Sequence, residues 1–108
     1  MNKYFNLKGS SVVGGKTVWE LTAPNEEGVN IKSITITSAA TASANLSFFI
    51  QNDPSSGTTN TYYITFDLAI PANTTLLLDE PSMFRFDISY GLYVKVGNSD
   101  NVDLIINT

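Results

Sequence analysis

The sequence predicts an all-β fold, a two-layer antiparallel β-sandwich of jelly-roll type with seven or eight strands. Apolar and polar residues alternate with a period of two in most of the chain, as at Ile34 and Ile36. Clusters of Gly, Pro, Asn and Asp separate these runs at intervals of about 8–12 residues. Asn, Ser and Thr make up 34 of the 108 residues, and they disfavour helices because their side chains compete for backbone hydrogen bonds.

Each expected strand lies between two turn clusters. The clearest one is 61–70, where all five even positions from Tyr62 to Ile70 are large and apolar. Because alternate side chains of a strand share a face, we expect Phe66, at the centre of this run, to be fully buried. The other runs alternate in the same way, and the expected strands span 16–22, 29–38, 44–51, 61–70, 74–79, 83–89, 92–97 and 101–107.

The chain length of 108 residues predicts one domain. We place the sandwich at 16–108 and an N-terminal arm at 1–15. The arm carries the apolar anchors Tyr4, Phe5 and Leu7 ahead of the Gly9-Ser10-Ser11 segment. Arms of this kind often become ordered only against a neighbouring molecule.

Composition excludes several function classes. The chain has no Cys and no His, and six scattered Lys and Arg residues give a net charge of −4. Disulfide and thiolate chemistry is therefore absent, and the commonest general base and transition-metal ligand is missing. A nucleic-acid partner is not expected without a clustered basic face. No apolar run reaches the ~20 residues of a membrane span, and no signal peptide is evident, so we expect synthesis in a cytoplasm.

No motif predicts a cofactor, a metal or catalysis. The segment GSSVVGGKT resembles a phosphate-binding loop, but it has five residues between Gly9 and Gly15 and leads into a strand rather than a helix. The segment 98–103 is rich in oxygen ligands but lacks the glycine and glutamate of a calcium loop. The adjacent acids Asp79 and Glu80 point to opposite faces of a strand. We therefore predict a protein that is not an enzyme.

Aromatic residues out of phase with the core rows are the most informative feature of the sequence. Side chains of these types are enriched where proteins meet. Three interpretations are open. These side chains form a protein interface, they form a stacking platform for sugars, or the sheet that carries them is covered on both sides within the monomer. The candidate partner-interface residues are Tyr4, Phe5, Phe49, Tyr63, Met83, Arg85 and Tyr93.

Five motifs of the sequence carry a resemblance to known proteins: KSITIT at 32–37, IPANTTL at 70–76, LDEP at 78–81, GLYVKV at 91–96 and NVDLII at 101–106. Through these motifs the chain resembles a group of small β-sandwich virion proteins of tailed bacteriophages, particularly marine ones. The resemblance covers roughly 16–108 and implies a structural role without a catalytic motif. It implies a capsid decoration or cement protein, or an accessory of the tail.

Two functions are compatible with these observations. The first is a virion protein that stabilises the phage head by contacts with the major capsid protein or other virion proteins, as a homo-oligomer with a trimer favoured. The second is a tail-associated carbohydrate-binding module that recognises host glycans through Trp19, Tyr63 and Tyr93. We favour the first, because no single strand carries a dense aromatic platform.

Overall fold

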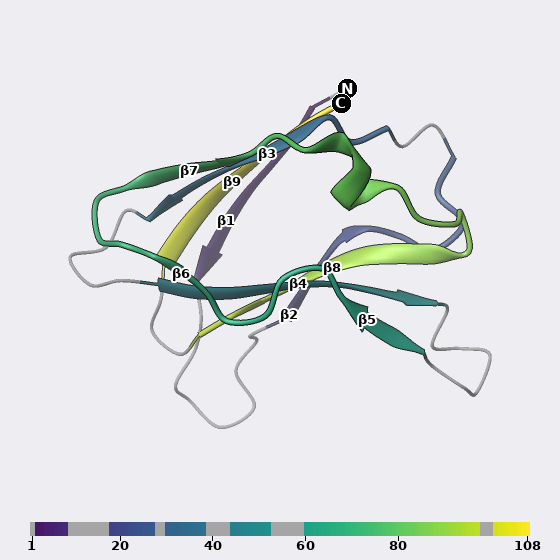
Figure 1. Ribbon diagram of the computed structural model, residues 1–108, viewed down its shortest axis with the longest axis horizontal. Coiled ribbons are helices and arrows are strands. Elements are labelled where there is room, and N and C mark those ends of the chain that lie inside the picture. Colours follow the sequence, from purple (N-terminus) through teal and green to yellow (C-terminus); the bar gives the residue numbers. More distant parts are fainter. Residues whose placement is uncertain (1, 9–17, 28–29, 39–43, 53–59, 98–100) are drawn as a thin grey trace.

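The protein is a sandwich of two antiparallel β-sheets (Figure 1). The computed structural model describes residues 2–8, 18–27, 30–38, 44–52, 60–97 and 101–108. Its strands are β1 (Lys3–Lys8), β2 (Val18–Thr22), β3 (Ser33–Ser38), β4 (Ala44–Asn52), β5 (Thr61–Tyr63), β6 (Leu68–Ile70), β7 (Thr75–Leu78), β8 (Tyr90–Val96) and β9 (Asn101–Asn107).

The strand order is that of a jelly roll. The first sheet runs β1-β9-β3-β7, and the second runs β2-β8-β4-β5, with β6 also paired to β4. The chain therefore passes between the sheets repeatedly, and β5 and β6 together occupy one strand position. All-β class and two-layer antiparallel architecture are confirmed. The described residues form nine strands, because residues 3–8 add β1, the expected strand 61–70 is divided into β5 and β6, and the expected strand 83–89 is not formed.

The core lies between the sheets and follows the predicted alternation. Ile34 and Ile36 of the first sheet are fully buried, as are Leu46 and Phe48 of the second. Each of these pairs occupies alternate positions of one strand, so one face of the strand is apolar. The remaining buried apolar side chains of the core are Leu7, Leu21, Ile31, Ala44, Ile70, Phe84, Leu92, Val94, Val96, Val102, Leu104 and Ile106.

The expected N-terminal arm is wrong for residues 3–8. These residues form β1, which pairs along β9 from Lys3 opposite Ile106 to Lys8 opposite Asn101. Leu7 is only 1% exposed and belongs to the core. The first sheet therefore includes β1 as an edge strand, and both termini lie at the same end of that sheet (Figure 1). Residues 9–15 of the expected arm lie outside the described residues.

The expected continuous strand 61–70 and the buried Phe66 are also wrong. After Tyr63 the chain leaves the sheet and rejoins β4 only at Leu68. β4 has two residues between these pairings, whereas the partner segment has four, Ile64 to Asp67. This bulge turns the Phe66 side chain outward, where it is 69% exposed.

The expected strand 83–89 is replaced by a 3₁₀-helix at Pro81–Phe84. Pro81 favours the start of a helix because its φ angle is preset and its missing N–H is not needed there. The Glu80 carboxylate accepts a hydrogen bond from the Ser82 backbone N–H at 3.3 Å. This turn brings Phe84 against the core, where it is 6% exposed.

A β-bulge shapes the pairing of β2 with β8. The register shifts between Glu20 and Thr22, and the buried Thr22 hydroxyl accepts the Leu92 backbone N–H at 3.0 Å. The chain after β2 passes so close to β8 that a Cβ at Gly91 would lie 2.5 Å from the Thr22 carbonyl oxygen and 2.8 Å from Pro24 Cδ. Only glycine fits this position without movement of the backbone.

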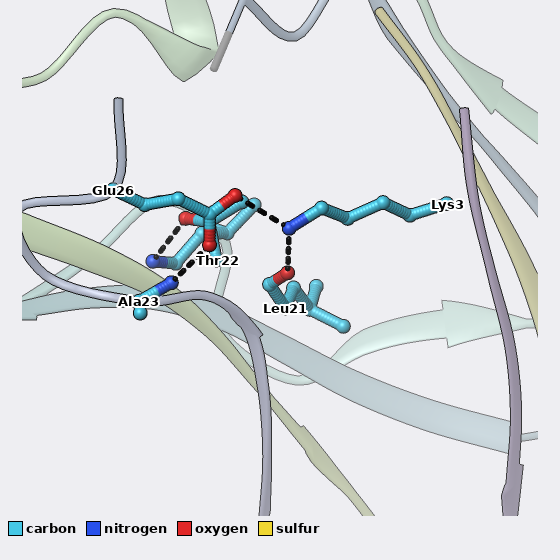
Figure 2. Close-up of polar contacts among 6 residues, drawn as sticks. Lys3, Leu21, Thr22, Ala23 and Glu26 are labelled. Carbon is cyan, nitrogen blue, oxygen red and sulfur yellow. Dashed lines mark hydrogen bonds and ion pairs between the residues drawn. The ribbon is translucent and has the colours of Figure 1, made fainter. Parts of the chain in front are cut away.

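An ion pair joins the two sheets at one end of the sandwich (Figure 2). Lys3 Nζ of β1 donates to Glu26 Oε2 at 2.7 Å and to the Leu21 carbonyl oxygen of β2 at 3.1 Å. Glu26 Oε1 accepts the Ala23 backbone N–H at 3.0 Å. The hydrogen bond from Lys3, followed by that from Ala23, holds the pKa of Glu26 below its ordinary value.

We predict that Gly91→Ala destabilises the protein by about 1–3 kcal/mol, because the added methyl group forces the Thr22–Pro24 backbone away from β8. Urea denaturation measures the change, and Lys95→Ala, at an exposed position of the same strand, is the control. Equal midpoints for Gly91→Ala and the wild type would contradict the close approach.

We predict that Glu26→Gln lowers stability at neutral pH by about 0.5–1 kcal/mol, a value that allows for solvent screening of a half-buried pair. Because the folded-state pKa of Glu26 is lowered, its contribution is complete above the ordinary value of about 4.5 and is lost as the pH falls through the folded value. The difference between variant and wild type in thermal melts should therefore vanish in acid. A difference that persists there would show that the charge is not responsible.

Candidate functional site

The candidate interface residues do not form one surface. Tyr4 lies on the outer face of the first sheet and is 71% exposed. Phe5 and Met83 are partly buried against the core, and Arg85 is exposed just after the 3₁₀-helix. Trp19, which would contact glycans only in the alternative of a carbohydrate-binding module, also packs against the core. Whether these residues meet a partner stays a prediction.

Phe49, Tyr63 and Tyr93 come together on the outer face of the second sheet, and Phe66 joins them. We call these four residues the aromatic cluster. Phe49 stacks on Tyr93 with ring centroids 5.7 Å apart and contacts Tyr63 at 5.5 Å. Tyr63 meets Phe66 edge to face at 5.1 Å. The register makes this possible, because Phe49 lies directly opposite Tyr63 of β5 and Tyr93 of β8.

The aromatic cluster has a buried layer and an exposed layer. Phe49 and Tyr93 are only 5% and 8% exposed, and the Tyr93 hydroxyl is hydrogen-bonded to Glu20 at 3.1 Å. Tyr63 and Phe66 are 53% and 69% exposed. The rings thus form a chain of contacts, in which Tyr93 stacks on Phe49, Phe49 supports Tyr63 and Tyr63 contacts Phe66.

The bulge 64–67 positions the exposed layer. The Thr65 hydroxyl accepts the Phe48 backbone N–H at 3.1 Å, and the Ser47 hydroxyl accepts the Asp67 backbone N–H at 3.0 Å. The Phe48 carbonyl oxygen accepts from both Ile64 and Thr65. Asp67 has a φ angle of +50°, in the left-handed region that Asp tolerates better than most residues. Bulges of this kind often direct side chains at binding sites.

A pocket of about 190 Å³ opens beside the exposed rings. β4 contributes outward-facing polar residues, the bulge contributes Phe66 and Asp67, and β8 contributes Lys95. Asp67 and Lys95 are its charged residues, and their formal charges cancel. The residues that line the pocket are Asn45, Ser47, Tyr63, Phe66, Asp67, Lys95 and Gly97.

The lining of this pocket combines aromatic, uncharged polar and charged side chains. Hydrolysis of a glycosidic bond needs two carboxyl groups flanking the bond, and among the described residues that line the pocket Asp67 is the one carboxylate. In the described parts of the chain no group of three acidic side chains is placed to hold a metal ion. That the protein is not an enzyme and carries no metal stays a prediction, and residues 98–100 of the calcium-like segment lie outside the described residues.

A second candidate surface crosses the outer face of the first sheet. Tyr4, Ile105, Thr35 and Leu77 are register neighbours on β1, β9, β3 and β7. Tyr4, Ile105 and Leu77 are 71%, 37% and 52% exposed. We call these three residues the apolar row.

Polar side chains on one flank of the apolar row bond to each other. Asn6 donates a hydrogen bond to Asp103, and the hydroxyls of Thr37 and Thr75 are 3.1 Å apart. Charged and amide groups on that flank are thus partly satisfied across the strands. The exposed apolar stripe between polar neighbours is typical of a surface that meets another protein.

The sequence analysis did not select Phe66, Asp67, Lys95, Ile105 or Leu77 as residues of a candidate site. For Leu77 the sequence itself indicates an exposed apolar side chain. Leu76-Leu77-Leu78 breaks the alternation, and of three consecutive leucines in a strand at least one must face outward. Lys95 and Ile105 lie out of phase with core rows, like the aromatic residues that we did select.

The comparisons with known proteins support the fold alone. No protein-family model matches this chain, and no curated protein does. The crystal structure of PirA is similar at a TM-score of 0.55 and 14% identity, over 97% of this chain and 91% of that one. At this identity the likeness shows a shared β-sandwich fold. It carries no information about activity.

Two further solved structures have lower similarity. The Anabaena sensory rhodopsin transducer matches at a TM-score of 0.48 and 16% identity, over 94% of this chain and 98% of that one. A chain of infectious bursal disease virus, Gx strain, matches at a TM-score of 0.39 and 14% identity, over 98% of this chain but only 33% of that one.

No described helix of this protein has the length and apolarity that a membrane crossing requires.

We predict that Phe48→Ala and Phe66→Ala differ sharply in stability. Phe48 is fully buried, so its truncation should cost about 3–5 kcal/mol. Phe66 is mostly exposed, so its truncation should cost less than about 1 kcal/mol, mainly the contact with Tyr63. Chemical denaturation of both variants measures the difference, and the opposite order would contradict the assignment of the two faces.

Proposed function

We propose that the protein is a non-enzymatic structural protein of a virion, which decorates or cements the capsid through protein–protein contacts. The observation that carries this proposal is the apolar row, Tyr4, Ile105 and Leu77, on the outer face of the first sheet. The resemblance of the sequence to small virion proteins of tailed bacteriophages supports the same role.

The apolar row suits attachment to a protein surface. Its three side chains cross the sheet from one edge strand to the other, so a partner contacts four strands at once. A sheet is a rigid support, and burial of an exposed aromatic or aliphatic side chain stabilises a complex by the removal of apolar area from water. On one flank Asn6, Thr37 and Thr75 are uncharged, and the Asp103 carboxylate accepts a hydrogen bond from Asn6.

The partner in this proposal is the major capsid protein or another virion protein, and the working unit is a homo-oligomer, with a trimer favoured. The protein is made in the host cytoplasm and assembles into the virion. Rotational symmetry repeats each contact around an axis, so a modest interface per subunit adds up to firm attachment.

The experiment that tests this function is rebinding to virions stripped of the protein. We predict that Leu77→Ser and Tyr4→Ser each weaken rebinding by about tenfold or more, because each removes exposed apolar area from the contact. Ile88→Ser, at a residue 58% exposed and outside the apolar row, is the matched control. Leu77→Ser, Tyr4→Ser and the control Ile88→Ser should all keep the wild-type circular dichroism spectrum.

Protein stoichiometry in purified virions separates the head from the tail. Hundreds of copies indicate the capsid, whereas a few to dozens indicate the tail. Absence of the protein from purified virions would refute the proposal. If Tyr4→Ser and Leu77→Ser rebind with wild-type affinity, the apolar row is not the attachment surface, and the virion role then rests on the stoichiometry alone.

A further inference from the structure

The pocket beside the aromatic cluster lies on the outer face of the second sheet, away from the apolar row. We propose that this pocket binds a neutral saccharide, with one pyranose unit against the exposed rings of Tyr63 and Phe66. The inference rests on the pocket and not on the virion role, because the two surfaces belong to different sheets.

The two exposed rings supply the apolar part of the site. Tyr63 and Phe66 meet at an interplanar angle of 87°, so their faces lie at a right angle along the pocket. A pyranose ring carries C–H groups on its faces and hydroxyl groups around its edge. It therefore suits a site that offers aromatic surface and hydrogen-bonding groups together.

The polar lining suits hydroxyl groups. Asn45 brings an amide, Ser47 a hydroxyl, Asp67 a carboxylate and Lys95 an ammonium group. Donors and acceptors are thus mixed, and a sugar hydroxyl both donates and accepts. Hydrogen bonds to the charged groups Asp67 and Lys95 are the stronger ones.

The charge of the pocket argues for a neutral ligand. Asp67 and Lys95 have opposite charges, so the lining is neutral in sum. The whole chain carries a net charge of −4, which repels an anionic polymer such as a nucleic acid or a sulfated glycan. An apolar ligand would cover the carboxylate of Asp67 and the ammonium group of Lys95 without offering them a hydrogen bond, which is costly.

The site is preorganised. The buried ring of Phe49, itself stacked on Tyr93, supports Tyr63, and the hydrogen bond from the Asp67 backbone N–H to Ser47 fixes the end of the bulge. The positive φ angle of Asp67 lies in this bulge, whereas those of Asn25 and Asn73 lie in turns between strands. Strained backbone of this kind persists at functional sites where surrounding contacts hold it.

The test uses the full chain and a panel of oligosaccharides. Calorimetric titration with neutral oligomers of glucose, galactose and mannose should detect binding of at least one, and sulfated or uronic-acid oligomers should bind more weakly or not at all. Tyr63→Ala and Phe66→Ala should each reduce the affinity by about tenfold or more. Asp67→Asn should also weaken binding, because a charge-assisted hydrogen bond becomes a neutral one.

Tyr62→Ala is the matched control. Tyr62 is 57% exposed, next to Tyr63 on the same strand but opposite Ile50, on the other face. Its loss should change the affinity by less than about twofold. Circular dichroism and melting curves confirm that each variant is folded, and Phe66→Ala tests the site even if Tyr63→Ala is unstable.

Three outcomes overturn the inference. The first is that none of the neutral oligomers binds at millimolar concentration. The second is that binding occurs but survives in folded Phe66→Ala and Asp67→Asn, which places the ligand elsewhere. The third is a preference for anionic oligomers. None of these outcomes touches the apolar row, so failure here and failure of virion attachment are measured separately.

Discussion

Strand β4 is the constraint on which the rest of the structure depends, because both of its faces are covered. Leu46 and Phe48 face the core and are fully buried, while the outward-facing Phe49 is covered by Tyr63 and Tyr93. A strand in a sandwich normally has one face in solvent. Here the same strand anchors the core and supports the aromatic cluster, so the packing that stabilises the fold also fixes the candidate binding surface.

The inner faces of the sheets are predictable from the sequence, whereas the bulge opposite β4 is not. Side chains at 33–38 and 101–107 alternate as expected, because burial of one face selects apolar residues at every second position. The bulge adds two residues, an even number, so Leu68 and Ile70 return to the core side in phase with Tyr62 and Ile64. The sequence therefore shows no break, and Phe66 is indistinguishable from a core residue.

The candidate surfaces required information that alternation does not contain. Parity selected Phe49, Tyr63 and Tyr93 as outward-facing, but only the strand register shows that they are neighbours. Likewise, the apolar row joins residues from opposite ends of the chain, since Tyr4 of β1 lies opposite Ile105 of β9. The apolar residues Tyr4, Phe5 and Leu7 suit an edge strand as well as an arm, and the pairing partner decides between the two.

The two proposed surfaces are compatible because they belong to opposite sides of the sandwich. The apolar row lies on the outer face of the first sheet and the pocket on the outer face of the second. A protein docked through the first sheet thus presents the second one outward. In these two proposals one pocket holds one sugar unit, and many copies on one particle raise the effective concentration of pockets near a polysaccharide. Attachment through one sheet therefore increases the usefulness of a weak site on the other, and neither surface needs to change shape.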